Sequence, residues 1–469
     1  MKAKIILIKL FIICFSSYHT IAISQTQIGN TILAAVDNDG TGDTVAISDD
    51  GNRIVVGIDK REVNNMATAG VAIVYELNNG QWQQLGQTLE GEMADQQFGH
   101  TVEMASNGNR IAVGGREGLK VYDFMANNWQ QVGQLITFPN LPSNGRILNM
   151  EFSLDGNTIA ISANLGDQSV GVLELQGTDW ILKGDYFSGN FGNVFGLSDS
   201  GDRLVIEHFD PSELWSLKVF DFSNGTWQQT GNTIQPNNGY RVSEGFDISG
   251  NGNRIVCGWD NEDGSGNGAI AIFDFSNNDW ILQNDFIFTT FFSRFGQTLQ
   301  LSQDGNEFIF ATAEDGANQE FSYAAFYSFE NNQWIQKGDQ IINQSIDETA
   351  QGHADITSDG TKTLIGGNRI EINNPKGFTK AFDYSAILNI TNFITSTEIT
   401  VYPNPSYNIL YLSYQHKNEL DYKIFDLNGK IVGSGIANKS IDITDLNSGV
   451  YFLNLFNNNF QDTIKFIKH

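Results

Sequence analysis

Seven copies of one short pattern constrain this chain more than any other feature. The first copy runs from Val45 to Gly57 and reads Val-Ala-Ile-Ser-Asp-Asp-Gly-Asn-Arg-Ile-Val-Val-Gly. Its turn glycine recurs as Gly51, Gly108, Gly156, Gly201, Gly252, Gly305 and Gly360, in steps of 57, 48, 45, 51, 53 and 55 residues. A period of about 50 residues indicates an array of similar supersecondary units, so the repeat takes precedence over any local motif.

Each copy predicts two antiparallel strands joined by a tight turn. Apolar residues alternate before the turn, as they do in a strand with one buried face, and the Gly and Asn of the turn tolerate positive φ. A second phrase follows each copy, again as strand, polar turn and strand. It places one tryptophan in each of six units, at Trp82, Trp129, Trp180, Trp227, Trp280 and Trp334. One Trp per unit at one register is typical of packing between neighbouring sheets, and a ligand-stacking ladder is the alternative.

Four-stranded sheets repeated radially form a β-propeller, so seven copies predict an all-β fold with seven blades. The seventh unit ends after its third strand, near Ser385, without a tryptophan. The missing strand is found at the N-terminus, where Thr26–Ile32 resembles Gln83–Leu89. We therefore expect the N-terminal strand to complete the last blade, which removes two open sheet edges.

The repeats resemble those of known propellers. Phe98-Gly-His-Thr-Val102, Phe191-Gly192 and Phe295-Gly-Gln-Thr-Leu299 are similar to FG-GAP repeats, and the Ser-x-Asp-Gly-Asn-x-Ile turns are similar to those of WD-like periplasmic propellers. The resemblance implies a propeller over roughly residues 25–388. The Phe-Gly pair is absent from the third and fifth units, and a resemblance at the level of the fold does not identify a ligand.

The first 24 residues are expected to be a secretory signal peptide. Lys2, Lys4 and Lys9 accompany an apolar run, and Ala22-Ile-Ser24 ends it with small residues. The run is too short to indicate a retained membrane span. Cleavage before Gln25 would leave Cys257 as the one cysteine of the mature chain, which excludes an intramolecular disulfide.

The chain is strongly acidic, with 54 Asp and Glu against 27 Lys and Arg and a formal net charge of −27. Such a surface disfavours nucleic acids and anionic membranes as partners. Solubility outside the cell explains this charge, and cation binding is the alternative.

A different pattern begins after a linker at 389–397. Thr397–Ser406, Tyr422–Val432, Ile441–Leu453 and Thr463–Lys468 combine alternating strands with Asn-Gly turns, which predicts a small β-sandwich of about seven strands. The order of these motifs over residues 398–469 resembles the type A C-terminal sorting domain of the Bacteroidota type IX secretion system. The resemblance implies that the type IX machinery is a partner, that the propeller is secreted or held at the outer cell surface, and that the sorting domain is removed. An independent adhesive sandwich is the alternative.

Ligand-binding residues are expected on one face of the propeller. The loops that join the second strand to the third, and the fourth to the next blade, are long and varied, and such loops over a rigid scaffold are preferred sites of function. One candidate set is the polar residue that follows the Phe-Gly position, where the first strand of a unit begins. These residues are Asp43, His100, Asn193 and Gln297. His353 lies near the same level, but no third His or Cys accompanies His100 and His353, which argues against zinc.

Aromatic side chains form a second predicted set on this face. Trp215 and Trp259 are assigned to loops after the second strand, and Phe291 and Phe292 to a loop between blades. Exposed rings of this kind stack on sugar faces in extracellular glycan binders. Packing of the loops against the blades is the alternative.

The sequence predicts no cofactor. The alternative is that the protein binds calcium. Asp37, Asp39 and Asp43 lie in an oxygen-rich loop, and Asp260–Asn267 is a second such loop, but neither has the ligand order of an EF-hand. A nucleophile elbow, a zinc-protease helix and a phosphate-cradling loop are absent from the sequence. The predicted function is therefore non-catalytic binding of a glycan or protein. The alternative is an extracellular polysaccharide lyase or glycoside hydrolase.

Overall fold

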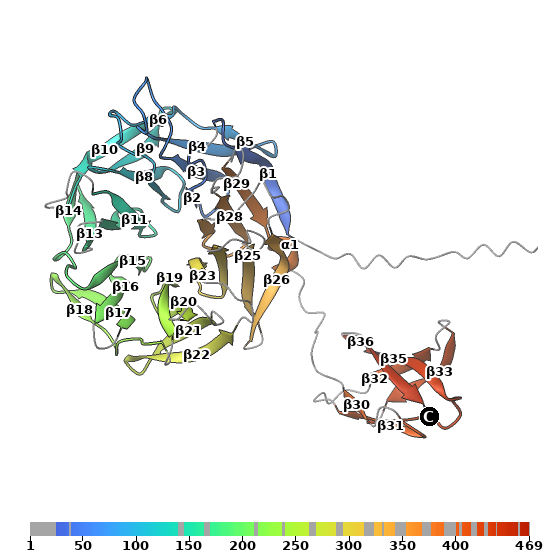
Figure 1. The fold of residues 1–469 in the computed structure, drawn as a ribbon. Helices are drawn as coiled ribbons and strands as arrows, with labels where there is room; N and C mark the ends of the chain where they lie inside the picture. The colour runs from blue at the N-terminus through green and yellow to red at the C-terminus, as the bar shows by residue number, and fades with distance from the viewer. Residues whose placement is uncertain are drawn as a thin grey trace, which may run out of the picture. The chain divides into compact units, whose positions relative to one another are not determined.

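The structure is a computed structural model, and it describes most of residues 25–468 (Figure 1). The residues outside the description within this range are 37–38, 139–144, 164–168, 211–213, 237–239, 262–268, 288–293, 314–322, 331–332, 343–352, 368–376, 389–399, 403–405, 414–419, 426–429, 438 and 458–459. The predicted signal peptide therefore lies outside the described residues. The chain divides into two compact units, Met1–Ile387 and Leu388–His469.

The first unit is a propeller of seven four-stranded antiparallel sheets, which confirms the predicted fold class. We denote the strands of each blade a to d, from the channel outward. Blade 1 contains β2 (Thr44–Ile47), β3 (Arg53–Ile58), β4 (Val71–Asn78) and β5 (Gln81–Gln84). Blade 2 contains β7 (Thr101–Met104), β8 (Arg110–Gly115), β9 (Gly118–Met125) and β10 (Asn128–Ile136). Blade 3 contains β11 (Ile147–Phe152), β12 (Thr158–Ala163), β13 (Ser169–Gln176) and β14 (Asp179–Leu182). A short fifth strand, β6 (Leu89–Glu90), also pairs with β4.

The remaining blades follow the same order around the ring. Blade 4 contains β15 (Phe191–Leu197), β16 (Arg203–Asp210), β17 (Leu214–Ser223) and β18 (Thr226–Gln229). Blade 5 contains β19 (Tyr240–Ile248), β20 (Arg254–Asn261), β21 (Ala269–Ser276) and β22 (Asp279–Ile287). Blade 6 contains β23 (Arg294–Leu301), β24 (Glu307–Ala313), β25 (Tyr323–Glu330) and β26 (Gln333–Ile342). Blade 7 is built from β27 (Ala354–Ile356), β28 (Lys362–Gly367), β29 (Phe378–Asp383) and the N-terminal strand β1 (Thr26–Leu33).

The two ends of the propeller sequence meet in blade 7. Strand β1 pairs antiparallel with β29, with Thr26 opposite Asp383 and Ile28 opposite Ala381. A single turn of helix, α1 (Ser385–Leu388), follows β29. Because β1 covers the outer edge of β29, blade 7 has the same four strands as its neighbours, and the ring is joined by hydrogen bonds between segments far apart in sequence.

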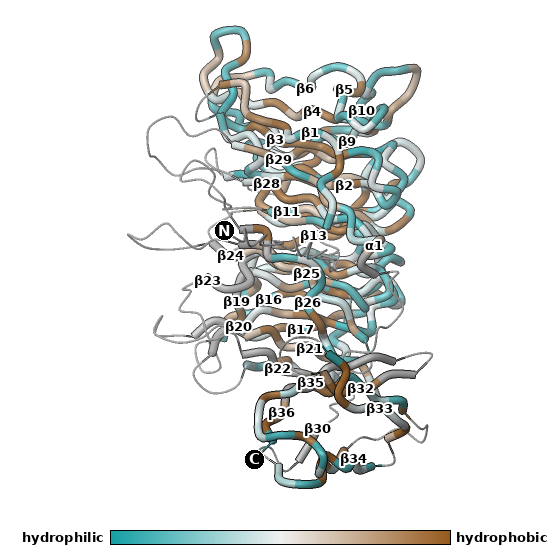
Figure 2. Tube along the Cα trace, turned by 90° about the vertical axis from the view of Figure 1, so that its right-hand side faces the viewer, coloured by the Kyte–Doolittle hydropathy of each residue, from teal (hydrophilic) through white to brown (hydrophobic). Residues whose placement is uncertain are grey.

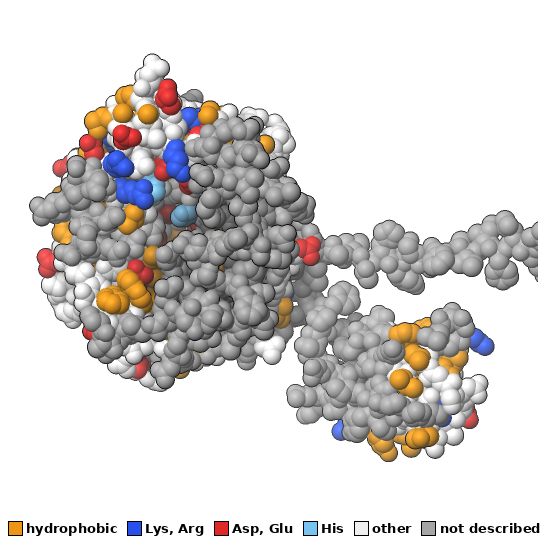
Figure 3. All heavy atoms as spheres, in the orientation of Figure 1, with side chains coloured by type: hydrophobic (Ala, Val, Ile, Leu, Met, Phe, Trp, Pro, Cys, Tyr) orange, Lys and Arg blue, Asp and Glu red, His pale blue; other side chains and the backbone are white. Residues whose placement is uncertain are grey.

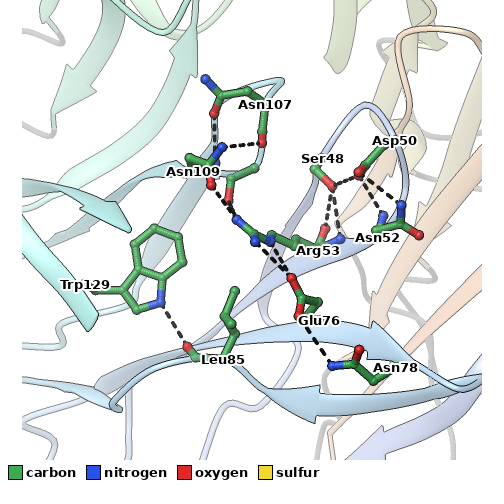
Figure 4. Close-up of polar contacts among 11 residues, drawn as sticks. Ser48, Asp50, Asn52, Arg53, Glu76, Asn78, Leu85, Asn107, Asn109 and Trp129 are labelled. Carbon is green, nitrogen blue, oxygen red and sulfur yellow. Dashed lines mark hydrogen bonds and ion pairs between the residues drawn. The ribbon is translucent and has the colours of Figure 1, made fainter. Parts of the chain in front are cut away.

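The turns between strands a and b, which have similar sequences in the repeats, also link each blade to the next (Figure 4). Arg53 donates hydrogen bonds to Glu76 of its own blade and to Gly108 O and Asn109 Oδ1 of the following turn, at 3.2 and 2.6 Å for the latter two. Ser48 Oγ accepts from Arg53 N at 3.0 Å, and Asp50 accepts from Asn52 N, so the turn itself is rigid. The same inter-blade contacts are made by Arg110, Arg203 and Arg254.

In blades 1 to 6 the tryptophan of the d strand packs against the preceding blade. Trp129 is 3% exposed, and its Nε1 donates to Leu85 O at 3.0 Å (Figure 4). A Cβ placed on Gly86 would lie 2.8 Å from Trp129 Cδ1, so the ring needs glycine beneath it, and Gly86 also has a φ of +76°. Trp82 packs in the same way over Gly29 of β1, and its Nε1 donates to Ile28 O at 3.1 Å. These tryptophans are therefore interior packing groups and not a ligand ladder.

Hydrophobic residues lie along the strands of the blades (Figure 2), and their side chains form clusters between neighbouring blades. One cluster contains Val205 of blade 4 together with Cys257, Trp259 and Trp280 of blade 5, each of which is at most 7% exposed. Cys257 is buried, forms no disulfide, and is thus a packing group. No helix in the described part of the chain is long and apolar enough to cross a membrane.

The second unit contains two small antiparallel sheets. One comprises β30 (Thr400–Tyr402), β31 (Ile409–Ser413) and β34 (Ser440–Asp442), and the other comprises β32 (Leu420–Phe425), β33 (Ile431–Ala437), β35 (Gly449–Asn457) and β36 (Phe460–Lys468). A shared core, which includes Leu410, Ile441, Leu453 and Phe466, joins the two sheets. This agrees with the β-rich C-terminal region expected from the sequence.

Candidate functional site

The side chains at the start of the a strands meet at one end of the channel. Asp43 directly precedes β2, His100 directly precedes β7, and Asp59 directly follows β3. His100 Nδ1 lies 3.0 Å from Asp59 Oδ2. Two of the residues predicted from the sequence, Asp43 and His100, therefore lie with Asp59, which sequence reasoning missed, and we call these three residues the mouth cluster.

The carboxylates of the mouth cluster are held in a poorly solvated environment. Burial raises the pKa of Asp43 to about 7, the charges of Asp59 and Asp39 add to this, and Lys60, whose Nζ lies 3.5 Å from Asp43 Oδ2, opposes it. Asp43 Oδ1 and Asp59 Oδ1 are buried and accept no hydrogen bond from any described residue. Buried carboxylate oxygens without donors carry a desolvation cost that a polar ligand can relieve.

The other predicted channel residues are less well defined. His353 directly precedes β27, and desolvation, followed by the charge of His100, lowers the pKa of its imidazole to about 4. Asn193 lies in β15 and Gln297 in β23, both in a strands, but their side chains fall outside the described residues.

The aromatic prediction requires correction. Trp215 lies in β17 and Trp259 in β20, so both residues are in strands and not in loops. Trp259 is 2% exposed within the interior cluster of blades 4 and 5, and Trp215 packs against the same cluster with its ring 5.1 Å from that of Phe209. The buried ring of Trp259 offers no face to a sugar. Phe291 and Phe292 lie outside the described residues.

In the first loop that was predicted to bind calcium, the carboxylate of Asp39 contacts other protein groups. Asp39 is 3% exposed, pairs with Arg61, and accepts from Thr41 N at 3.0 Å. The carboxylate predicted as a calcium ligand is therefore neutralised by a guanidinium. Asp37 and most of Asp260–Asn267 lie outside the described residues. Among the residues that the structure describes, no group of three or more His, Cys, Asp or Glu side chains could hold a metal ion.

The opposite half of the channel contains an acidic ring that sequence reasoning missed. It consists of Glu103, Glu151, Asp247 and Asp355, each five residues before the turn glycine of its own repeat. Burial is the first cause that raises the pKa of each member, to about 7 for Asp247 and Asp355. The register within the repeat was the signal that could have identified the ring from the sequence.

The acidic ring fastens the inner strands to one another. Glu151 accepts a hydrogen bond from Leu197 N, Asp247 from Leu301 N, and Asp355 from Ile47 N, each at 2.8 or 2.9 Å and each in the following blade. The inner edge of an a strand has backbone donors without a neighbouring strand, and these carboxylates satisfy them. The ring is therefore explained by inter-blade pairing.

Comparison with known proteins identifies the C-terminal unit and the fold. Residues 400–469 match the family described as the secretion system C-terminal sorting domain. The Cps50 (Swd1) β-propeller domain of Myceliophteria thermophila superposes with a TM-score of 0.50 at 10% identity, covering 76% of this chain and 99% of that one. The RRP9 WD40 repeats give 0.47 at 8% identity, covering 76% and 99%.

A third solved structure is a putative 6-phosphogluconolactonase from Bacteroides uniformis ATCC 8492, with a TM-score of 0.45 and 14% identity, covering 67% of this chain and 88% of that one. No curated protein matches the sequence. The protein is thus a β-propeller exported by type IX secretion to the cell surface or beyond. FG-GAP identity is not shown by these comparisons, and the Cps50 (Swd1) domain supports the β-propeller fold alone.

Proposed function

We propose that the propeller is a non-catalytic binding module for a glycan or protein ligand. The ligand binds at the end of the channel that carries the b–c loops and the loops between blades, which we call the long-loop face. The observation that carries the proposal is the mouth cluster, in which Asp43 and Asp59 each keep one buried carboxylate oxygen without a described donor. The hydroxyl groups of a sugar or the amides of a peptide are donors of the required kind.

A second function, that of an extracellular polysaccharide lyase or glycoside hydrolase, is favoured by one specific feature. The Asp59–His100 contact at 3.0 Å resembles the carboxylate–imidazole pair of a general base, and Asp43 has a pKa of about 7. Binding remains the first proposal because the buried oxygens of Asp43 and Asp59 lack donors among the described residues, and a bound ligand supplies such donors without any reaction.

The proposal predicts binding without turnover. We expect the purified full chain to bind at least one class of extracellular glycan or protein on an array, and the His100→Ala variant to bind it about tenfold or more weakly while melting at a similar temperature. Incubation of the bound glycan with the protein should release no shorter oligosaccharides. Release that is abolished by His100→Ala would instead establish the enzyme, and normal binding by this variant would place the ligand elsewhere.

A further inference from the structure

Positive charge is concentrated beside the mouth cluster although the chain as a whole carries a net charge of −27. Figure 3 shows Lys and Arg side chains next to His side chains on the long-loop face. The cations placed here by the contacts already described include Lys60 and Arg61 of blade 1. Two more, Arg116 and Arg146, lie between blades 2 and 3, and we call them the arginine pair.

The backbone holds the arginine pair together across the blade boundary. Arg116 directly follows β8, Arg146 directly precedes β11, and the two residues form an antiparallel bridge. Arg116 N also donates to Gln96 O at 2.8 Å. The two side chains then converge on one atom, because Gln97 Oε1 lies 3.2 Å from Arg116 Nε and 3.4 Å from Arg146 Nη1.

Gln97 is held in an unfavourable conformation at this point. Its φ is +52°, in the left-handed region that residues with a side chain rarely adopt. Hydrogen bonds from Gln97 N to Thr68 O and from Phe98 N to Ala69 O, both at 2.9 Å, fix the loop in place. Backbone strain of this kind is found at functional sites, where surrounding contacts over-determine it.

The arginine pair differs from the other described arginines in what it contacts. Each inter-blade arginine, and Arg61 as well, is neutralised by a carboxylate. These pairs are Arg53–Glu76, Arg61–Asp39, Arg110–Asp123, Arg203–Asp221 and Arg254–Asp274. Arg116 and Arg146 share a neutral amide oxygen, and no described carboxylate lies within ion-pair distance of either. Among the described residues, most of their guanidinium donors therefore have no hydrogen-bond acceptor.

We propose that the arginine pair is the anion-recognition subsite of the proposed binding site and that the ligand is an acidic polysaccharide. Two adjacent guanidinium groups match the oxygens of a sugar carboxylate or sulfate bidentately. The mouth cluster beside them accepts hydrogen bonds from sugar hydroxyls. Because the rest of the surface repels anions, the subsite selects a glycan that presents its charge at this position and excludes indiscriminate binding of polyanions. This inference rests on the proposed function.

Polymers with one backbone and different charges test the inference. The full chain is titrated with carboxymethyl dextran, dextran sulfate and uncharged dextran, and with oligogalacturonate as a uronate, at low and high ionic strength. We expect at least one anionic sugar polymer to bind, uncharged dextran not to bind, and affinity to fall as salt rises. The carboxylate and sulfate arms distinguish the two sources of the anion.

Variants connect the binding to the arginine pair. R116Q and R146Q should each weaken binding by about tenfold or more, since each removes charge-assisted hydrogen bonds. Arg116→Lys keeps the charge but loses the planar fork, so it should recover only part of the affinity. The control is Lys337→Gln on β26, whose Nζ pairs with Glu330 at 2.6 Å and which removes the same charge away from the long-loop face. Thermal melting of every variant separates lost binding from lost folding.

Each other outcome has a defined meaning. Binding of neutral glycans alone would overturn the acidic ligand and leave the binding function standing. Binding of poly-glutamate but of no glycan would overturn the inference in favour of a protein partner. Equal losses in R116Q and Lys337→Gln would show a general charge effect and also overturn it. If no glycan or protein binds, both the inference and the proposed function fail.

Discussion

Replacing Trp129 by alanine should destabilise the propeller by about 3–5 kcal/mol, as truncation of a large buried aromatic does. The ring is 3% exposed, packs over Gly86 of the preceding blade, and donates to Leu85 O, so its loss opens a cavity at a blade boundary and leaves a partly buried acceptor without its donor. Chemical denaturation monitored by fluorescence and circular dichroism would measure the change.

A matched control comes from the same hairpin. Met125 is 47% exposed at the end of β9, and Met125→Ala should change the free energy of unfolding by less than about 0.5 kcal/mol. Trp259→Ala should behave like Trp129→Ala, because its ring is 2% exposed. If Trp129→Ala proves as mild as Met125→Ala, the tryptophans do not hold the blades together.

The acidic ring should make the propeller more stable in mild acid than at neutral pH. The folded pKa values of Asp247 and Asp355 are raised to about 7 from 3.8 by burial. The folded state therefore binds protons more strongly than the unfolded state between these values. The stabilisation is complete below pH of about 4 and is lost as pH rises through about 7. A shift of this size in one such group corresponds to about 4 kcal/mol, so we expect the free energy of unfolding to fall by several kcal/mol across that window.

Glu151→Gln provides the internal test of this pH dependence. Burial and the charge of Asp247 raise the pKa of Glu151, and its Oε2 accepts from Leu197 N, a bond that an amide oxygen can also accept. The variant should therefore remain folded and show a weaker decline in stability between pH 4 and 8, measured by denaturation at each pH. The groups facing it across the channel are Glu103, Asp247, Asp355, Asp49 and Asp199. An unchanged slope would remove Glu151 from the titrating ring.

The sequence was most informative where the repeat controls the structure. Alternating strands, turn glycines and one tryptophan per unit predict the blades, because each unit must bury its faces against identical neighbours. Trp259 was wrongly assigned to a loop, although it lies seven residues after the turn glycine Gly252, at the register where Ile58 ends β3 (Arg53–Ile58).

The functional residues were predictable only in part. Asp43 and His100 share a register of the repeat, and so do the carboxylates of the acidic ring, although the ring becomes evident only when the repeats are aligned at their glycines. The arginine pair has no such register. Arg116 and Arg146 meet because two blades pack side by side, and Gln97 reaches them through a loop conformation that no propensity would favour.

Hydrogen–deuterium exchange of the full chain, with and without the ligand identified on the array, tests the central claim most directly. The account predicts slower amide exchange on the long-loop face, at residues 58–61, 96–101 and 115–117, with no change in the a–b turns at residues 48–53 and 105–110. Protection confined to the a–b turns would place the ligand at the acidic end of the channel and contradict the proposed site.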